Sequence, residues 1–251
     1  MIDFIVAIPA RYASTRLPGK PLCLIAGQPM IVHVVNRALA AGAKQVVIAT
    51  DDQRIVDAVN IKGVTVCLTS KDHQSGTDRL AECASLLNWS DDQIIVNLQG
   101  DEPFAPAAGI RQVATLLAQS SSEMATLACA LDSNEQFNNP NVVKVARRSD
   151  GRALYFSRAP IPYVRDDLAN AFNKSLRHIG IYAYRSGFLK KFSTLAVSPL
   201  ESYESLEQLR VLENGFTIAV EVAISEFPSG VDTPEDLEQA NLYWNTHHVN
   251  S

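Results

Sequence analysis

Several features common in other protein classes are missing from this chain of 251 residues. No apolar run approaches the roughly 18 residues that span a membrane, and the start at Met1-Ile-Asp3 lacks the charged segment of a signal peptide. Basic residues are not in excess, because 22 Lys and Arg residues face 27 Asp and Glu residues and leave a net charge of −5. General nucleic-acid binding usually needs a basic face. We therefore expect a cytoplasmic protein without membrane insertion and without a nucleic-acid partner.

Cysteine is also scarce. The four cysteines, Cys23, Cys67, Cys83 and Cys129, are far apart and form no Cys-x-x-Cys pair. This spacing is typical of small buried apolar side chains rather than of disulfides or zinc ligands.

Two common phosphate-binding motifs are absent as well. No Gly-x-Gly-x-x-Gly segment occurs, so the chain lacks the glycine-rich fingerprint of dinucleotide-binding proteins. A P-loop needs Ser or Thr after Gly-Lys, but Pro21 follows Gly19-Lys20, and Ser14 stands where the first glycine should be. A phosphate site in this chain would therefore depend on side-chain cations more than on backbone amides.

Apolar periodicity predicts a sheet covered by helices, since 47% of the residues are hydrophobic and occur in regular patterns. In the first half of the chain, the expected strands are residues 4–8, 45–50, 64–68, 94–98 and 124–131, and the expected helices are 30–41, 53–60, 77–87 and 108–118. This alternation is typical of βαβ units and a parallel sheet, in which the strand 94–98, apolar except for Asn97, should be central.

The second half has a different pattern. The expected elements are an antiparallel hairpin at 142–146 and 153–156, a loop or lid at 158–176, strands at 179–184 and 216–224, and helices at 198–214 and 233–243. Both helices have a strong start signal, with Ser198 or Thr233 at the N-cap, proline next, and an acid three residues later.

The loop after the first strand is rich in cations. Arg11, Arg16 and Lys20 lie in residues 9–22, which contain no acid. Open α/β sheets bind ligands in the crevice beyond the carboxyl ends of their strands, so cations there predict an anion site. A solvated basic loop is the alternative, but three prolines and one glycine restrict the backbone and favour a prearranged site.

Two aspartates are candidates for binding a metal. Asp101 directly follows the central strand, where a carboxylate suits Mg²⁺, an ion that takes one or two carboxylates besides phosphate oxygens and water. Asp232 precedes the Thr233 N-cap. The structural alternatives are a turn cap for Asp101 or Glu102 and a helix-dipole contact for Asp232.

Six segments resemble blocks of a known family. They are Ile8-Pro-Ala-Arg-Tyr-Ala-Ser-Thr-Arg-Leu-Pro-Gly-Lys20, His73-Gln-Ser-Gly-Thr77, Asn97-Leu-Gln-Gly-Asp-Glu-Pro103, Tyr155-Phe-Ser-Arg158, Leu206-Glu-Gln-Leu-Arg210 and Gly230-Val-Asp-Thr-Pro-Glu-Asp-Leu237. Together they span nearly the whole chain. The sequence resembles the sugar-acid cytidylyltransferases, and among them the 3-deoxy-manno-octulosonate (Kdo) cytidylyltransferase family.

The resemblance implies a three-layer, Rossmann-like α/β nucleotidyltransferase fold, with a mostly parallel sheet and an inserted antiparallel part for substrate binding and dimerisation. It implies one domain over residues 1–251. Its nucleotide-binding part would cover about 1–131, its sugar-binding and dimerisation part about 132–225, and its metal-ligand loop and last helix 226–251. A homodimer is expected.

The resemblance also implies residue roles. Catalytic positions match Arg11, Lys20, Asp101 and Asp232, and metal ligands match Asp101 and Asp232. Nucleotide-binding positions match Ala10, Arg11, Ser14, Lys20, Gln74, Ser75, Gly76, Thr77, Gln99 and Asp101. Sugar-binding positions match Arg158, His178, Tyr182, Glu207 and Gln208. From the residues alone, Ser75 or Thr77 would be a helix N-cap, His178 a structural histidine, and Glu207 and Gln208 part of a solvated helix face.

The implied reaction is the Mg²⁺-dependent transfer of CMP from CTP to the anomeric hydroxyl of Kdo, with release of pyrophosphate, for lipopolysaccharide synthesis. One alternative is the same reaction on an 8-amino-3,8-dideoxy analogue or another sugar acid. The other is a non-catalytic nucleotide-binding regulatory module, because a fold alone does not determine function.

Overall fold

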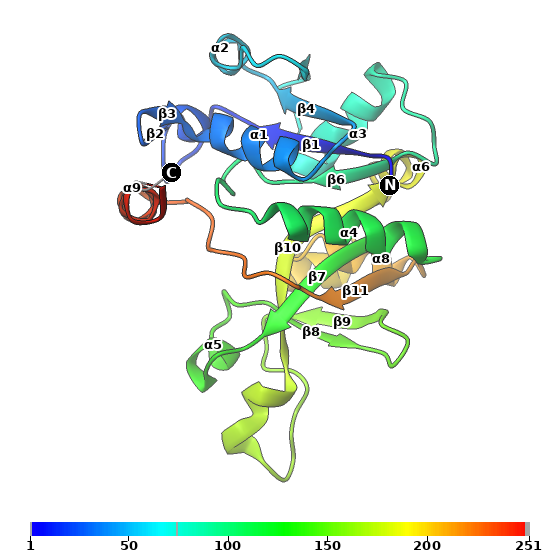
Figure 1. The fold of residues 1–251 in the computed structure, drawn as a ribbon. Coiled ribbons are helices and arrows are strands. Elements are labelled where there is room, and N and C mark those ends of the chain that lie inside the picture. Colours follow the sequence, from blue (N-terminus) through cyan, green and yellow to red (C-terminus); the bar gives the residue numbers. More distant parts are fainter. Residues whose placement is uncertain (1, 74, 249–251) are drawn as a thin grey trace.

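A twisted mixed sheet forms the centre of the computed structural model, which describes residues 2–73 and 75–248 (Figure 1). The strands on its main path are β1 (Phe4–Ala10), β4 (Gln45–Thr50), β5 (Val64–Leu68), β6 (Ile94–Asn97), β7 (Met124–Ala130), β10 (Leu176–Arg185) and β11 (Ile218–Val222). Their order across the sheet is β11-β7-β10-β6-β1-β4-β5. β6, β1, β4 and β5 are parallel, whereas β10 is antiparallel to both of its neighbours, β6 and β7. The predicted central place of the apolar strand that starts at Ile94 is confirmed.

Helices cover both faces of the sheet. One face packs against α1 (Met30–Ala40), α2 (Gln53–Ala58) and α4 (Ala107–Gln119), and the other against α3 (Gly76–Leu86), α6 (Ser186–Phe192) and α8 (Gln208–Glu213). Each helix turns an apolar stripe toward the sheet: in α1, for example, Ile31, Val34, Val35 and Ala38 are fully buried. The two hydrophobic clusters on opposite faces confirm the predicted three-layer α/β architecture.

The predicted hairpin forms beside the main path of the sheet. Its strands are β8 (Lys144–Arg147) and β9 (Ala153–Ser157), and β8 also pairs with the start of β10. β10 already begins at Leu176, so the predicted loop at 158–176 ends where β10 starts. That loop contains the 3-10 segment η2 (Leu168–Lys174) and forms an arm that extends beyond the sheet (Figure 1).

The predicted helix at 198–214 is wrong as a single element. It is two short helices, α7 (Pro199–Glu204) and α8, separated at Ser205, which has left-handed backbone angles (φ 50°, ψ 50°). Its predicted start is confirmed: the Ser198 side chain accepts from the Glu201 amide, and the Glu201 carboxylate accepts from the Ser198 amide.

Several short elements have no counterpart in the sequence-based expectations. They are the 3-10 turn η1 (Lys20–Leu22), the small ribbon β2 (Leu24–Ile25) and β3 (Gln28–Pro29), α5 (Asn134–Asn138) and α6. The last helix, α9 (Pro234–His248), runs beyond the predicted end at 243, and it packs near the β2–β3 ribbon.

The cysteines are only partly as expected. Cys67 and Cys83 are buried, but Cys23 and Cys129 are half-buried. Within the described ranges, no helix is both long enough and apolar enough to cross a membrane.

Candidate active site

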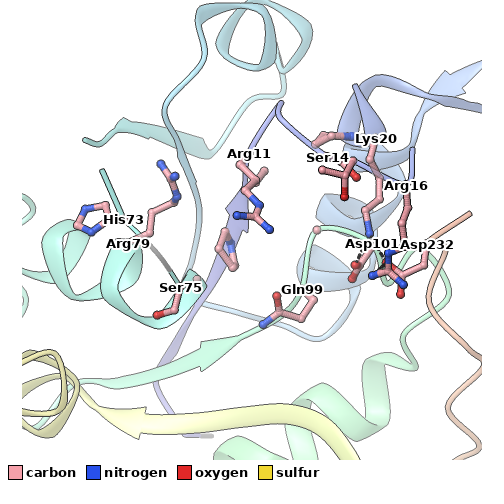
Figure 2. A pocket seen from close by; sticks show the side chains of 16 residues that line it. Arg11, Ser14, Arg16, Lys20, His73, Ser75, Arg79, Gln99, Asp101 and Asp232 are labelled. Atoms are coloured by element: carbon pink, nitrogen blue, oxygen red, sulfur yellow. Dashed lines mark hydrogen bonds and ion pairs between the residues drawn. The ribbon is translucent and has the colours of Figure 1, made fainter. Parts of the chain in front are cut away.

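A polar cavity of about 270 Å³ opens at the carboxyl ends of β1 and β6 (Figure 2). Its lining residues are Pro9, Ala10, Arg11, Ser14, Thr15, Arg16, Lys20, Pro21, His73, Ser75, Gly76, Arg79, Gln99, Gly100, Asp101 and Asp232. The cavity thus brings together every predicted nucleotide, catalytic and metal residue except Thr77, which is buried at the start of α3, and Gln74, which lies outside the described residues.

The cationic loop is held in place at Gly19. This glycine has φ +67°, in the left-handed region, and a Cβ there would lie 3.1 Å from the Tyr12 hydroxyl and 3.2 Å from the nearest ring carbon. The tight passage leads directly into η1, which begins with Lys20 and places this side chain at the cavity. A larger residue at position 19 would therefore displace either Tyr12 or the turn that presents Lys20.

Lys20 joins the two predicted metal ligands. Its Nζ donates to Asp101 Oδ2 at 2.6 Å and to Asp232 Oδ1 at 2.7 Å, as Figure 2 shows. Burial lowers the pKa of Lys20, but the charge and hydrogen bond of Asp101, together with those of Asp232, outweigh burial and raise the pKa above its usual value. Lys20 is therefore a permanently charged group between two carboxylates.

Close backbone packing explains how Asp232 reaches Asp101. The Val231 amide donates to the Asp101 carbonyl at 2.9 Å, and a side chain at Gly230 would lie 3.1 Å from that same oxygen. Only a residue without Cβ allows this approach without a shift. Gly230 thus brings the segment before α9 against the end of β6.

The carboxylate pair fits a divalent cation by its charge and convergence. Asp101 and Asp232 point at one shared cationic atom, and their negative charges, after burial, help to raise the pKa of neighbouring Glu102 to about 7. Among the described residues, no group of three or more His, Cys, Asp or Glu side chains could hold a metal ion. Two converging carboxylates suit an ion that takes one or two protein carboxylates and completes its shell with phosphate oxygens and water, as Mg²⁺ does.

Two further arginines differ in how they are held. Arg16, on the exposed side of the loop, donates from Nη2 to Asp232 Oδ1 at 2.9 Å. Arg11 points into the middle of the cavity in Figure 2, and it makes no ion pair with any carboxylate of the described ranges. An unpaired guanidinium in a concave polar site is suited to phosphate.

Sequence reasoning missed a second polar network at the edge of the cavity. Arg79 is almost fully buried and donates from Nη2 to Asp51 Oδ2 at 2.8 Å and from Nη1 to Thr69 Oγ1 at 2.6 Å. His73 contacts Glu82 nearby, and Glu82 accepts from the Ser70 amide. Helical spacing could have indicated Arg79, because it lies one turn after Ser75 and so on the same face of α3.

The N-terminus of α3 carries the predicted polar segment. The Ser75 side chain accepts from the Asp78 amide, so the capping interpretation is confirmed for Ser75. Thr77 Oγ1 donates to Glu207 Oε2 at 2.7 Å. This bond links the nucleotide-side segment to α8, whose residues were predicted to contact the sugar.

Four of the five predicted sugar-side residues lie on the face of the sheet covered by α3 and α8. The centroid of the His178 ring lies 5.0 Å from that of Phe156 and 5.2 Å from that of Tyr182. Burial lowers the pKa of His178 to about 3. Burial raises the pKa of Tyr182, and the charge of Glu207 adds to this rise. Beside them, Glu207 Oε1 and Gln208 Nε2 are buried without a hydrogen-bond partner in the described chain.

Such unpaired buried atoms are costly, because each forfeits its bonds to water. A polar ligand that fills the space beside α8 would satisfy them. Arg158 is placed differently, because its guanidinium donates to backbone carbonyls of Pro140, Glu204 and Ser205.

Known proteins resemble this chain over nearly its whole length. A sequence model of the family described as Cytidylyltransferase matches residues 5–221. A protein of Xanthomonas campestris pv. campestris named 3-deoxy-manno-octulosonate cytidylyltransferase is 60% identical over 244 residues, which cover 94% of this chain and 87% of the relative. A protein of the same name from Stenotrophomonas maltophilia is 54% identical over 253 residues and covers 98% of both chains.

The fold agrees with these sequence relationships. A solved structure of CMP:2-keto-3-deoxy-manno-octonic acid synthetase in complex with CTP superposes with a TM-score of 0.88 and 41% identity, covering 98% of this chain and 99% of the other. The cavity of this protein, with its cationic loop and paired aspartates, thus lies in a chain that belongs to the cytidylyltransferase family.

Proposed function

We propose that this protein transfers CMP from CTP to the anomeric hydroxyl of Kdo and releases pyrophosphate. The observation that carries the proposal is the cavity in which Arg11 and Lys20 face Asp101 and Asp232. Cations suit the triphosphate and the leaving pyrophosphate, and the carboxylate pair suits a divalent cation. The names of the relatives and the CTP complex of the structural neighbour support the choice of both substrates.

The residues of the chain have separate tasks in this scheme. Arg11 and Lys20 bind the phosphates and stabilise charge that develops on the leaving group. The polar N-terminus of α3, with Ser75 and Gly76, together with Gln99, lines the place for the nucleoside. His178, Tyr182, Glu207 and Gln208 orient the sugar so that its anomeric oxygen faces the α-phosphorus, which gives most of the rate through positioning.

Asp101 and Asp232 would hold Mg²⁺. When bound, this ion would supply Lewis-acid neutralisation of the α-phosphoryl charge. Without the ion, Lys20 offsets only part of the negative charge of the aspartate pair.

We also propose a homodimer that works in the cytoplasm, where it supplies an activated sugar for lipopolysaccharide synthesis. Support for the dimer comes from the arm after β9. Tyr163 is 76% exposed there and lines a cavity of about 610 Å³ whose other lining residues are mostly apolar and include Pro160, Pro162 and Phe137. Exposed apolar surface of this kind is typical of protein interfaces. Sedimentation-velocity ultracentrifugation tests the dimer, and a monomer at micromolar concentration would contradict it.

A pyrophosphate-release assay tests the function. CTP, Kdo and Mg²⁺ together should give steady release, and omission of the sugar or addition of EDTA should abolish it. UTP in place of CTP should react far more slowly. A protein that binds CTP but releases no pyrophosphate with any sugar acid would instead be a non-catalytic nucleotide-binding module.

A further inference from the structure

Arg158 does not present a free guanidinium to the cavity. Its Nε donates to the Glu204 carbonyl at 2.6 Å, its Nη1 to the Pro140 carbonyl at 2.9 Å and its Nη2 to the Ser205 carbonyl at 3.3 Å. Both ends of the planar fork are therefore directed at backbone oxygens. A carboxylate ligand could bind this guanidinium in a bidentate manner only by displacing these hydrogen bonds.

Two of the three carbonyls that Arg158 holds, those of Glu204 and Ser205, belong to the break between α7 and α8. A helix ends with carbonyls that have no partner inside the helix, and a basic side chain can satisfy them. The next residue, Ser205, has φ 50° and ψ 50°, a left-handed conformation that is unfavourable for residues other than glycine. The break therefore depends on outside support, and Arg158 supplies it from the end of β9.

Glu204 and Lys144 hold the backbone of Arg158 in turn. Glu204 Oε2 accepts from the Arg158 amide at 2.9 Å, and its Oε1 accepts from Ser157 Oγ at 2.6 Å. Lys144 is completely buried, and its Nζ donates to the carbonyls of Asn139, Val142 and Arg158 at 2.9, 2.6 and 2.7 Å. No described carboxylate lies within ion-pair distance of Lys144, so its charge is satisfied by these backbone oxygens.

The residues that follow the break carry the unpaired atoms beside the predicted sugar. Glu207 lies at the start of α8, and Gln208 is the first residue of that helix. Glu207 Oε1 and Gln208 Nε2 are buried without a partner among the described residues, and their direction depends on where α8 starts. A shift of the break at Ser205 would therefore move both side chains.

We propose that Lys144, Arg158 and Glu204 form a positioning cluster that fixes the α7–α8 break and aims Glu207 and Gln208 at the sugar substrate. In this assignment Arg158 is a positioning residue rather than a direct ligand of the sugar carboxylate. The inference rests on the proposed function for its substrate. Its structural content, the support of the break, can be tested without turnover.

Steady-state kinetics with Glu204→Gln, Lys144→Met, Arg158→Gln and Arg158→Lys test the cluster. Each should raise the KM for Kdo about tenfold, the usual effect of losing one charge-assisted hydrogen bond, and leave the KM for CTP within about twofold. The double variant with Arg158→Gln and Glu204→Gln should raise the KM for Kdo little more than either single variant does, because both residues act on the same α7–α8 break. Tyr155→Phe is the control, since it removes only a long 3.4 Å contact to Glu204 Oε1 and should behave as wild type.

Two results would overturn the assignment. One is a wild-type sugar KM in Glu204→Gln and Lys144→Met while Arg158→Gln alone is impaired, which would make Arg158 a direct ligand. The other is a double variant in which the effects of Arg158→Gln and Glu204→Gln on the KM for Kdo add in full. The lysine variant removes a buried charge and is the one most at risk of misfolding, and in that case the Glu204 and Arg158 pair decides the question.

Hydrogen exchange separates failure of the cluster from failure of the proposed function. In Glu204→Gln, the amides of residues 205–209 should exchange faster than in wild type, while those of α3 should not change. Equal exchange at 205–209 would contradict the cluster. If wild type turns over no sugar acid, the proposed function fails, but this comparison still tests the support of the α7–α8 break.

Discussion

Lys20 is the side chain at which the loop after β1 meets both aspartates. Removing it should weaken CTP binding and leave two neighbouring carboxylates without their cation. We predict that Lys20→Ala lowers CTP affinity by at least tenfold in isothermal titration, and that Arg11→Ala does so as well, because a charged hydrogen bond is worth about 1.5–3 kcal/mol. Lys44→Ala, at an exposed pair with Asp3 away from the cavity, is the matched control. Unchanged affinity and turnover in both cavity variants would make the loop a solvated surface.

The aspartates should matter more for turnover than for folding. Asp101→Asn and Asp232→Asn keep the shape of the side chain but remove its charge. We predict a loss of about 10²–10³ in kcat, the typical effect of removing one electrostatic contact to the transition state. Circular dichroism should show native folding. Near-wild-type turnover of Asp232→Asn at saturating Mg²⁺ would remove it from the metal site.

His178 makes stability depend on pH. Its pKa falls from 6.5 to about 3 because burial disfavours the charged ring, and neighbouring Arg177 adds to the effect. A depressed pKa means that the unfolded chain takes up a proton that the folded chain does not, so this contribution to stability is present above pH 6.5 and is lost as the pH falls toward 3.

Urea unfolding between pH 7.5 and about 4.5 measures this dependence. His178→Gln should lose less stability over this range than wild type, because the replacement does not titrate. Parallel curves for the two proteins would show that His178 has the same pKa in the folded and the unfolded chain, which would contradict this prediction. At pH 7.5 the same variant should raise the KM for Kdo and leave CTP binding intact.

At the scale of elements, α7 and α8 are joined by a buried ion pair. Arg210 donates from Nε and Nη2 to the two oxygens of Glu201 at 2.7 and 2.6 Å, and the side chains are only 9% and 11% exposed. Arg210→Leu would leave the carboxylate buried without its partner. Such a loss typically costs about 3–5 kcal/mol, so we predict a drop of that size in the free energy of unfolding.

Urea titration at pH 7.5 measures this loss, with Lys44→Ala as the reference. The pair of Lys44 with Asp3 is exposed, and such pairs contribute little. Equal stability of the two variants would show that the Glu201 charge finds other partners after the α7–α8 pair is broken.

The sequence predicts well those elements whose signals are local. Strand β6 starts with the apolar run Ile94–Val96, and the helix start at Ser198 is a capping box, so both are where periodicity and capping place them. The break at Ser205 was not predictable in this way, because its support comes from Arg158, which lies in a distant segment. Helix α6 was missed because its seven residues are too few to show a helical apolar period and no side chain caps its start at Arg185.

The site was predictable to the same degree. The cations of the loop and the carboxylate after β6 are local features, and the structure places them around one cavity. The close pairing of Asp101 with Asp232 was not predictable from spacing, since it depends on the close approach at Gly230. The raised pKa of Glu102 was not predictable either, because it needs burial beside two other acids. Long-range packing decides what sequence spacing alone leaves open.

At the scale of the whole molecule, the choice of sugar follows from residues on two elements. The charge of Glu207, at the start of α8, helps to raise the pKa of Tyr182 on β10, and an acid at position 207 suits either a hydroxyl or an ammonium group. We predict that equal amounts of Kdo and its 8-amino analogue in one reaction give mainly CMP-Kdo by mass spectrometry. A product ratio tenfold in favour of the amino sugar, about 1.4 kcal/mol, would reverse this choice but not the type of reaction.

The most direct test of cytidylyl transfer follows the phosphorus atoms themselves. In ³¹P NMR of CTP, Kdo, Mg²⁺ and the protein, the α-phosphorus signal should convert to that of a phosphodiester in CMP-Kdo, while the β and γ signals convert together to pyrophosphate in equal amount. The Asp232→Asn protein should leave the CTP signals nearly unchanged over the same time. Conversion of CTP to CDP and phosphate, or to CMP without a sugar phosphodiester, would contradict attack by the sugar oxygen on the α-phosphorus.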